Sequence, residues 1–170
     1  MASTQTQILN PTHPSGFAPV AGPAVPVTFA AGTTAARVEY AALVLRVALG
    51  AMFIAHAALK YFVFTLPGTA QFFASLGLPG ALGYVVFAVE LVGGVLLILG
   101  VQTRAVALAL VPVLLGATWV HAGNGWLFSA PNGGWEYPAF WTVTLVVQAL
   151  VGAGAYALRP AGPALVTQRA

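Results

Sequence analysis

Four long apolar segments alternate with short polar or glycine-rich stretches along this chain. The apolar segments cover residues 39–64, 81–99, 104–122 and 137–158. Each is close to the roughly 20 residues that an α-helix needs to cross about 30 Å of hydrocarbon. The pattern therefore predicts an all-α polytopic membrane protein in which four transmembrane helices form a bundle.

The connections between these segments differ in length and composition. The first, at about residues 65–80, is punctuated by prolines and glycines, whereas the second, GVQTR, is so short that we expect a tight helical hairpin. The third, GNGWLFSAPNGGWEYP, is rich in Gly, Asn and Trp, as is typical of a loop at the level of lipid headgroups. In the fourth apolar segment, GAGAY at 152–156 is interpreted as small residues that let helices approach closely.

The N-terminal stretch differs from the rest of the chain. Residues 1–36 are rich in proline, and each proline removes a backbone donor that a helix would need. No Lys or Arg precedes Arg37, so the basic first region of a secretory signal is missing. We expect residues 1–36 to be a disordered tail, residues 37–159 to form the membrane domain, and residues 160–170 to be a short cytoplasmic tail.

Composition agrees with a membrane location and excludes several other classes of protein. The 170 residues are 59% hydrophobic and 5% charged, whereas soluble domains are about 25% charged. Six Lys and Arg residues are too sparse for a nucleic-acid surface, so the expected partner is the lipid bilayer. The absence of cysteine excludes disulfides, thiolate metal sites and Fe–S clusters.

The basic residues predict an orientation. With four spans both termini lie on one side, and most of the basic residues fall there: Arg37, Arg104, Arg159 and Arg169. Cytoplasmic loops of membrane proteins carry an excess of Lys and Arg. We therefore expect a multi-pass protein of the cytoplasmic (inner) membrane with both termini in the cytoplasm.

Charged residues inside the apolar segments are the first candidates for function, because each costs about 2.5–3.5 kcal/mol on insertion scales. Arg46 and Glu90 are expected to form a buried ion pair, which either fixes helix register or belongs to a proton or substrate site. At about 100° per residue, Arg46, His56 and Lys60 share one face of the first helix. Lys60 has the alternative interpretation of an interface anchor.

Two histidines are predicted at one depth. His56 and His121 each lie about 17 residues, or about 25 Å, from the cytoplasmic boundary, and Glu136 begins the fourth segment at the same end. The predicted pocket has His56, His121, Lys60 and Glu136 as catalytic candidates and Trp126, Trp135 and Phe53 as cofactor-contacting aromatic residues.

Such a pocket suits a quinone head group, because imidazole can donate to a carbonyl and exchange protons. His56 and His121 would exchange the protons, and Lys60 would polarise a quinone oxygen. Glu136 would orient a histidine. Two level histidines could instead ligate a haem iron, or hold a non-haem metal with Glu136. The spacing is diagnostic of neither, so no metal is predicted and haem is a minor alternative.

In chain order these motifs resemble the DoxX family of small membrane proteins. The motifs are LRVALGAMFIAHAALKYF at 45–62, FFASLGLPG at 72–80, ELVGGVLLILGVQTR at 90–104, His121, and NGGWEYP at 132–138. The resemblance covers about residues 37–159. One departure is Ala57, where the family commonly has glycine after the histidine.

The resemblance implies a four-helix membrane fold and an oxidoreductase-associated role, since some relatives are linked to quinone-reducing or terminal oxidase complexes. We therefore expect a redox-linked membrane subunit that binds quinone or quinol near the outer leaflet, with redox enzyme subunits as partners. A small-solute or proton transporter with a path through Arg46, Glu90 and His56 is one alternative. A non-catalytic assembly subunit is another, and homo-oligomerisation is compatible with each.

Overall fold

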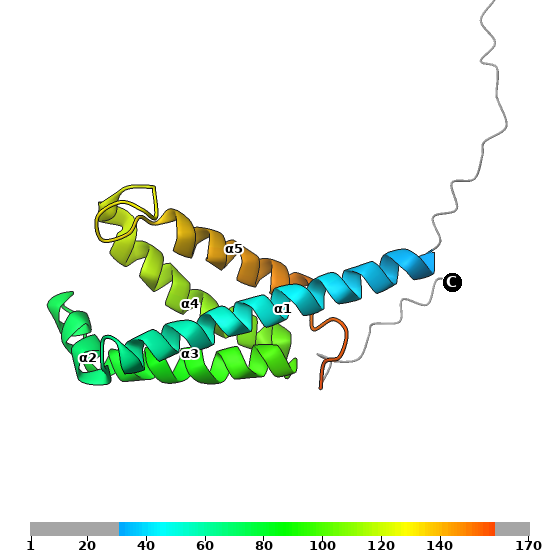
Figure 1. The fold of residues 1–170 in the computed structure, drawn as a ribbon, viewed down its shortest axis with the longest axis horizontal. Helices are drawn as coiled ribbons and strands as arrows, with labels where there is room; N and C mark the ends of the chain where they lie inside the picture. Colours follow the sequence, from blue (N-terminus) through cyan, green and yellow to red (C-terminus); the bar gives the residue numbers. More distant parts are fainter. Residues whose placement is uncertain (1–30, 159–170) are drawn as a thin grey trace, which may run out of the picture.

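Five α-helices and one short 3-10 helix make up residues 31–158, the part of the chain that the computed structural model describes (Figure 1). In chain order they are α1 (Ala31–Phe62), α2 (Leu66–Ser75), α3 (Ala81–Leu99), α4 (Thr103–His121), η1 (Ala122–Asn124) and α5 (Glu136–Val151). No strand occurs within this range. The predicted all-α fold is therefore confirmed.

Three of the described helices are long and apolar enough to cross a membrane: Gly32–Phe62, Ala81–Leu99 and Thr103–Asn124. The fourth apolar segment, expected to be helical over 137–158, ends its helix at Val151. Gly152 and Gly154 follow with φ of +89° and +70°, a backbone conformation that glycine adopts readily. α5 has 16 residues and is about 24 Å long by helix geometry, so a fourth span stays a prediction.

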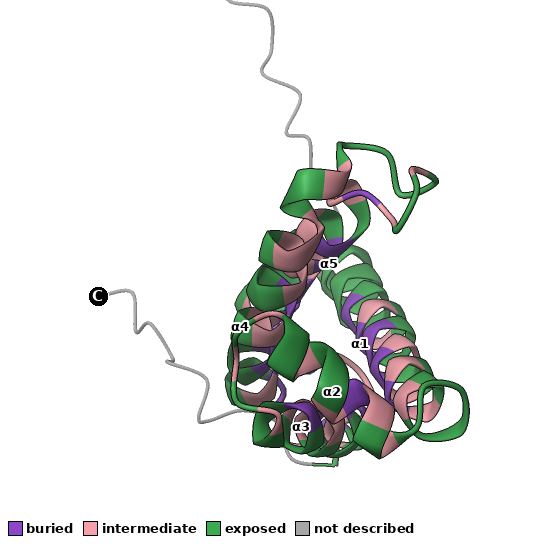
Figure 2. Cartoon of the chain, turned by 90° about the vertical axis from the view of Figure 1, so that its left-hand side faces the viewer, coloured by how far each residue is buried: buried purple, intermediate pink, exposed green. Residues whose placement is uncertain are grey.

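The helices form two antiparallel pairs that meet along the core. α1 packs along α3 and α4 along α5, while α1 also contacts α5 and α3 contacts α4 (Figure 1). Figure 2, viewed from the end that carries α2, shows buried residues on the inward faces of these helices and exposed residues on the outward faces. The core is made of Leu49, Phe53, Leu97, Ala107, Leu110, Leu114, Trp141 and Leu145.

Two glycines bring α1 and α3 into direct backbone contact. A Cβ atom on Gly50 would lie 2.6 Å from the carbonyl oxygen of Gly94, and one on Gly94 would lie 2.8 Å from that of Gly50. Small residues at such crossings are typical of membrane helices, where close van der Waals packing drives association. This contact fixes the register of α1 against α3, and the register decides which charged residues meet.

The ends of α1 and the connection after it differ from the sequence prediction. α1 begins at Ala31, inside the segment predicted to be a tail; the remainder of that segment and residues 159–170 lie outside the described residues. The connection contains α2, which was not predicted. Its first turn is capped by Thr65, whose hydroxyl oxygen accepts a hydrogen bond from the Gly68 N–H at 3.2 Å, and Pro67 suits that first turn.

Candidate functional site

A buried ion pair joins α1 to the middle of α3. The Lys60 ammonium donates to both carboxylate oxygens of Glu90, with Nζ 2.7 Å from Oε2 and 2.9 Å from Oε1. The side chains are 17% and 6% exposed, respectively. Pairing spares each group from being a lone ion in the apolar interior. Glu90 was correctly expected to have a basic partner, but that partner is Lys60.

The predicted pair of Arg46 with Glu90 is wrong. Arg46 donates from Nη2 to the carbonyl oxygen of Ala155 at 3.0 Å, and its Nη1 lies against Gly100, at the end of α3. Gly100 follows Glu90 by ten residues, about 15 Å along a helix. The antiparallel register of α1 and α3 therefore places Arg46 at the end of α3 and Lys60 beside its middle.

His56 lies one helical turn before Lys60 and contacts α5. Its Nδ1–H donates to the Met52 carbonyl oxygen at 3.0 Å, within the same helix, and this hydrogen bond directs the lone pair of the neutral imidazole to Nε2. The centroid of its ring is 4.8 Å from that of Trp141. His56, Lys60 and Glu90, together with Trp141, form what we call the α1–α3 polar cluster.

Phe53 packs behind Trp141 and does not face a ligand. The two ring centroids are 4.5 Å apart, and Phe53 has 0% of its surface exposed. Its predicted role as a cofactor contact therefore does not match its position. It fixes the orientation of the indole instead.

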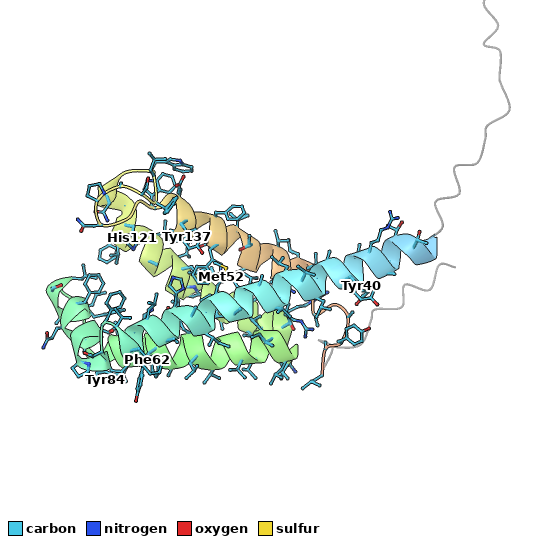
Figure 3. All side chains as sticks on the ribbon, viewed as in Figure 1. Tyr40, Met52, Phe62, Tyr84, His121 and Tyr137 are labelled. Carbon is cyan, nitrogen blue, oxygen red and sulfur yellow. The ribbon has the colours of Figure 1, made fainter. Side chains whose placement is uncertain are left out.

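His121 fastens the loop between α4 and α5. Its Nδ1 lies 3.1 Å from the Asn132 carbonyl oxygen and 3.0 Å from that of Gly133, and Asn124 donates to the same two oxygens. Figure 3 shows His121 at the end of α4, apart from Met52, whose carbonyl oxygen binds His56. We call residues 122–135 the α4–α5 loop.

Glu136 supports the same loop from the start of α5. Its Oε1 accepts a hydrogen bond from the Phe128 N–H at 2.8 Å. Between residues 31 and 158, no hydrogen bond, ion pair or ring contact joins His121 or Glu136 to His56 or Lys60. The residues expected to share one pocket thus fall into two groups, the α1–α3 polar cluster and the α4–α5 loop.

A cavity of about 500 Å³ opens where the α4–α5 loop meets α5. It is lined by Trp126, Phe128, Glu136, Tyr137, Ala139, Phe140 and Val143. Trp135 packs edge-on against Trp126, with ring centroids 4.5 Å apart, so it supports the wall from behind. Of the predicted site residues, Trp126 and Glu136 therefore line a real cavity.

Tyr137 and Trp141 connect this cavity to the α1–α3 polar cluster, and sequence reasoning missed both. The Tyr137 ring lies 6.0 Å from that of Trp141, which in turn contacts His56. Trp141 is buried, and its Nε1 has no hydrogen-bond partner in the described part of the chain. Their spacing of four residues places the two rings on one face of α5, which is the signal that could have identified them.

The described residues bring no three His, Cys, Asp or Glu side chains together in a way that could hold a metal ion. The two histidines have different partners, and no contact places them at one point within residues 31–158. The haem alternative, which needs both on one iron, therefore gains no support from the geometry.

Part of this chain is similar to a known protein family and to a known relative. Residues 41–123 match the model of the DoxX family, and this range contains α3, α4 and three members of the α1–α3 polar cluster, His56, Lys60 and Glu90. A Bacillus subtilis (strain 168) protein named "Putative oxidoreductase CatD" is 43% identical over 79 residues, which cover 46% of this chain and 58% of that protein. The chain thus spans less than two thirds of that relative's length. No solved structure matches it significantly.

Proposed function

Since residues 41–123 of this chain match the DoxX family model, we propose that the protein is a redox-linked membrane subunit that binds quinone or quinol. The name of the Bacillus subtilis relative, "Putative oxidoreductase CatD", supports a redox role. Ionisable groups within membrane-spanning segments are costly, and they are candidates for functional sites by default. The observation that carries the proposal is the α1–α3 polar cluster, in which His56 adjoins an ion pair and contacts Trp141.

The cavity beside α5 is the proposed ligand site. Its volume of about 500 Å³ lies in the range of small-molecule pockets, about 300–1,000 Å³. Its aromatic walls suit a flat ring, and Glu136 and the Tyr137 hydroxyl are the polar groups that could orient it. The buried Trp141 lies against Tyr137 and outside the cavity lining, with its Nε1 unpartnered in the described structure.

A quinone supplies a two-electron, two-proton redox couple when it is bound, and a redox partner subunit would exchange the electrons with it. The chain's own residues would handle the protons. His56 lies one helical turn before Lys60, and its Nε2 would accept a proton from the ligand. Glu90 would then take up that proton from His56. Lys60 would keep Glu90 ionised between turnovers. His121 and Glu136 would maintain the shape of the cavity rim through the α4–α5 loop.

We also propose that α5 crosses the membrane, so that both termini lie in the cytoplasm of a multi-pass protein of the cytoplasmic membrane. A hydrophobic stretch shorter than the bilayer is accommodated by local thinning at a modest cost. In this orientation the α4–α5 loop and α2 lie at the outer face. The distribution of Arg37 and Arg104 supports it.

Binding of a short-chain ubiquinone to the full chain in mild detergent tests the proposal. Tyr137→Phe removes the hydroxyl at the cavity wall and keeps an aromatic ring, so affinity should fall about 2- to 10-fold, the value of one hydrogen bond. Tyr84→Phe at an exposed position of α3 is the matched control and should bind as the wild type does. Absence of binding to the wild-type protein overturns the proposal.

An oxidised-minus-reduced absorption spectrum of the same preparation tests the redox part. A quinone-type ultraviolet change that His56→Ala abolishes supports it. A proton flux into proteoliposomes without quinone, lost in Glu90→Gln, would instead favour the transporter alternative.

A further inference from the structure

Arg46 is a buried cation whose charge is unbalanced within the described structure. It is 1% exposed. Only Nη2 has a partner, the Ala155 carbonyl oxygen, whereas Nε and Nη1 have none among residues 31–158. The ion pair found in that range is formed by Lys60 and Glu90, and Lys60 follows Arg46 by 14 residues, about 21 Å along α1. Burial of an unpaired charge is unfavourable, so a counter-charge is expected.

Two further buried polar atoms lack partners at this end of the bundle. Thr103 Oγ1 and Gln148 Oε1 belong to residues with 0% exposure, and neither atom has a hydrogen bond in the described structure. Thr103 is the first residue of α4 and comes three residues after Gly100, where any Cβ atom would overlap Arg46 Nη1. The turn that leads into α4 therefore passes directly beside the guanidinium.

Helix register places Gln148 at the same level as Arg46. The contact of Phe53 with Trp141 fixes α1 against α5, and these helices run in opposite directions (Figure 1). Arg46 precedes Phe53 by seven residues, and Gln148 follows Trp141 by seven. Seven residues are about two turns and about 10 Å. Both side chains consequently project from facing sides of their helices at one depth.

The N-terminus of α4 adds positive potential at this point. No side chain caps it, and free N–H groups with the helix dipole favour an anion there. Arg104 also approaches, because a Cβ atom on Gly152 would lie 3.3 Å from its Nε. The Arg46 guanidinium, the Thr103 hydroxyl and the N-terminus of α4 thus lie together, with Arg104 beside Gly152, and no described carboxylate forms an ion pair with either arginine.

We infer that Arg46, Thr103 and the N-terminus of α4 form a binding site for a phosphate group, with Gln148 Oε1 accepting from a hydroxyl on the same ligand. Phosphate matches the planar fork of arginine and the donors of a helix N-terminus. The site lies level with the end of α3, a 19-residue membrane helix, and therefore at headgroup depth. An anionic lipid or free inorganic phosphate could supply the group.

Residues 152–158, which we call the closing segment, cover this site. Ala155 accepts from Arg46 and donates its N–H to the Glu39 carbonyl oxygen at 3.1 Å. The Leu158 N–H donates to the Leu99 carbonyl oxygen at 3.0 Å. Figure 1 shows this segment leaving α5 and passing α1 toward the end of α3. A phosphate oxygen would compete with the neutral Ala155 carbonyl for Nη2, and charge-assisted hydrogen bonds are the stronger kind.

The test is ligand binding to the full chain in mild detergent, measured by native mass spectrometry and by the thermal unfolding midpoint. The probes are phosphatidylglycerol, inorganic phosphate and a diacylglycerol with the same acyl chains. Phosphatidylglycerol should bind and raise the midpoint, whereas diacylglycerol should not. Thr103→Val removes a hydroxyl without a partner, so the protein should fold and lose about tenfold or more in affinity. Arg46→Gln should abolish binding.

Thr118→Val is the matched control, because Thr118 lies on α4 away from the site and bonds the Leu114 carbonyl oxygen. It should bind as the wild type does. Binding of inorganic phosphate alone identifies a free phosphate site, and binding of the lipid alone identifies a headgroup site. Equal affinity of the wild type and Thr103→Val for the probe that binds, or binding of neither phosphatidylglycerol nor inorganic phosphate above the level of diacylglycerol, overturns the inference. This site lies at the opposite end of α5 from the proposed quinone site, so neither result depends on the other.

Discussion

Lys60 and Glu90 form an ion pair in which Nζ lies within 2.9 Å of both carboxylate oxygens. The pair joins α1 and α3, which cross at Gly50 and Gly94. The pair lies inside a segment that is otherwise apolar. Its position follows from the backbone contact of Gly50 with Gly94, which leaves no freedom for α1 to slide along α3.

Removal of one member of this pair should destabilise the protein more than removal of both. Glu90→Leu leaves a buried ammonium and should cost about 3 kcal/mol, the lower end of the range for broken buried pairs, because Lys60 retains 17% exposure. Lys60→Met with Glu90→Leu should recover much of that loss. Unfolding of Glu90→Leu, Lys60→Met and the double variant in detergent measures the difference. Additive losses in the double variant would mean that the two residues do not interact.

Gly94→Ala should separate α1 from α3. The added methyl would lie 2.8 Å from the Gly50 carbonyl oxygen, and such overpacking typically costs about 1–3 kcal/mol. Gly116→Ala is the control on α4, since its methyl would meet nothing within 4 Å and the change favours the helix by up to about 1 kcal/mol. Denaturant unfolding compares the two. Equal stability of the variants would refute the close crossing.

His121→Ala should loosen the α4–α5 loop. The substitution removes the single Nδ1–H donor shared between the carbonyl oxygens of Asn132 and Gly133, a hydrogen bond that contributes about 1 kcal/mol. Hydrogen–deuterium exchange should rise in peptides from residues 125–135 and stay unchanged in α3. Unaltered exchange in the loop, with quinone affinity lost, would instead assign His121 to the ligand.

Gly154→Ala should detach the closing segment. Gly154 has φ of +70°, and its Cβ would lie 2.5 Å from the Glu39 carbonyl oxygen, so the substitution is strained in two ways. Exchange should rise at residues 152–158, and Arg46 should become accessible to an arginine-selective reagent. Gly123→Ala, where nothing lies within 4 Å, controls for the methyl itself. Protection of Arg46 in the variant would contradict the proposed covering role.

The extent of the membrane helices was largely readable from the sequence. The segments expected at 81–99 and 104–122 became Ala81–Leu99 and Thr103–His121, because Gly100 and the proline-glycine connection mark their ends. α2 was missed although Thr65 and Pro67 carry the signal of a capped helix start. The resemblance to the DoxX family is confirmed over residues 41–123.

The partner of Glu90 could not be read in the same way. Arg46 lies at the end of α3 and not beside its middle, and the offset comes from the register of α1 against α3. The register of two helices depends on contacts such as that of Gly50 with Gly94, which one helix alone does not reveal. Trp141 was missed for a related reason, since an aromatic residue in an apolar span is indistinguishable from core until its neighbours are known.

The ion pair has a consequence for the response of the protein to membrane voltage. A Lys60–Glu90 pair with both members ionised carries no net charge, so an electric field across the bilayer does almost no work on it. Uptake of one proton by Glu90 leaves a single positive charge at that depth, and one charge carried across the full field corresponds to about 2.3 kcal/mol per 100 mV. The protonation state of Glu90 thus decides whether the transmembrane potential exerts a net force on this region.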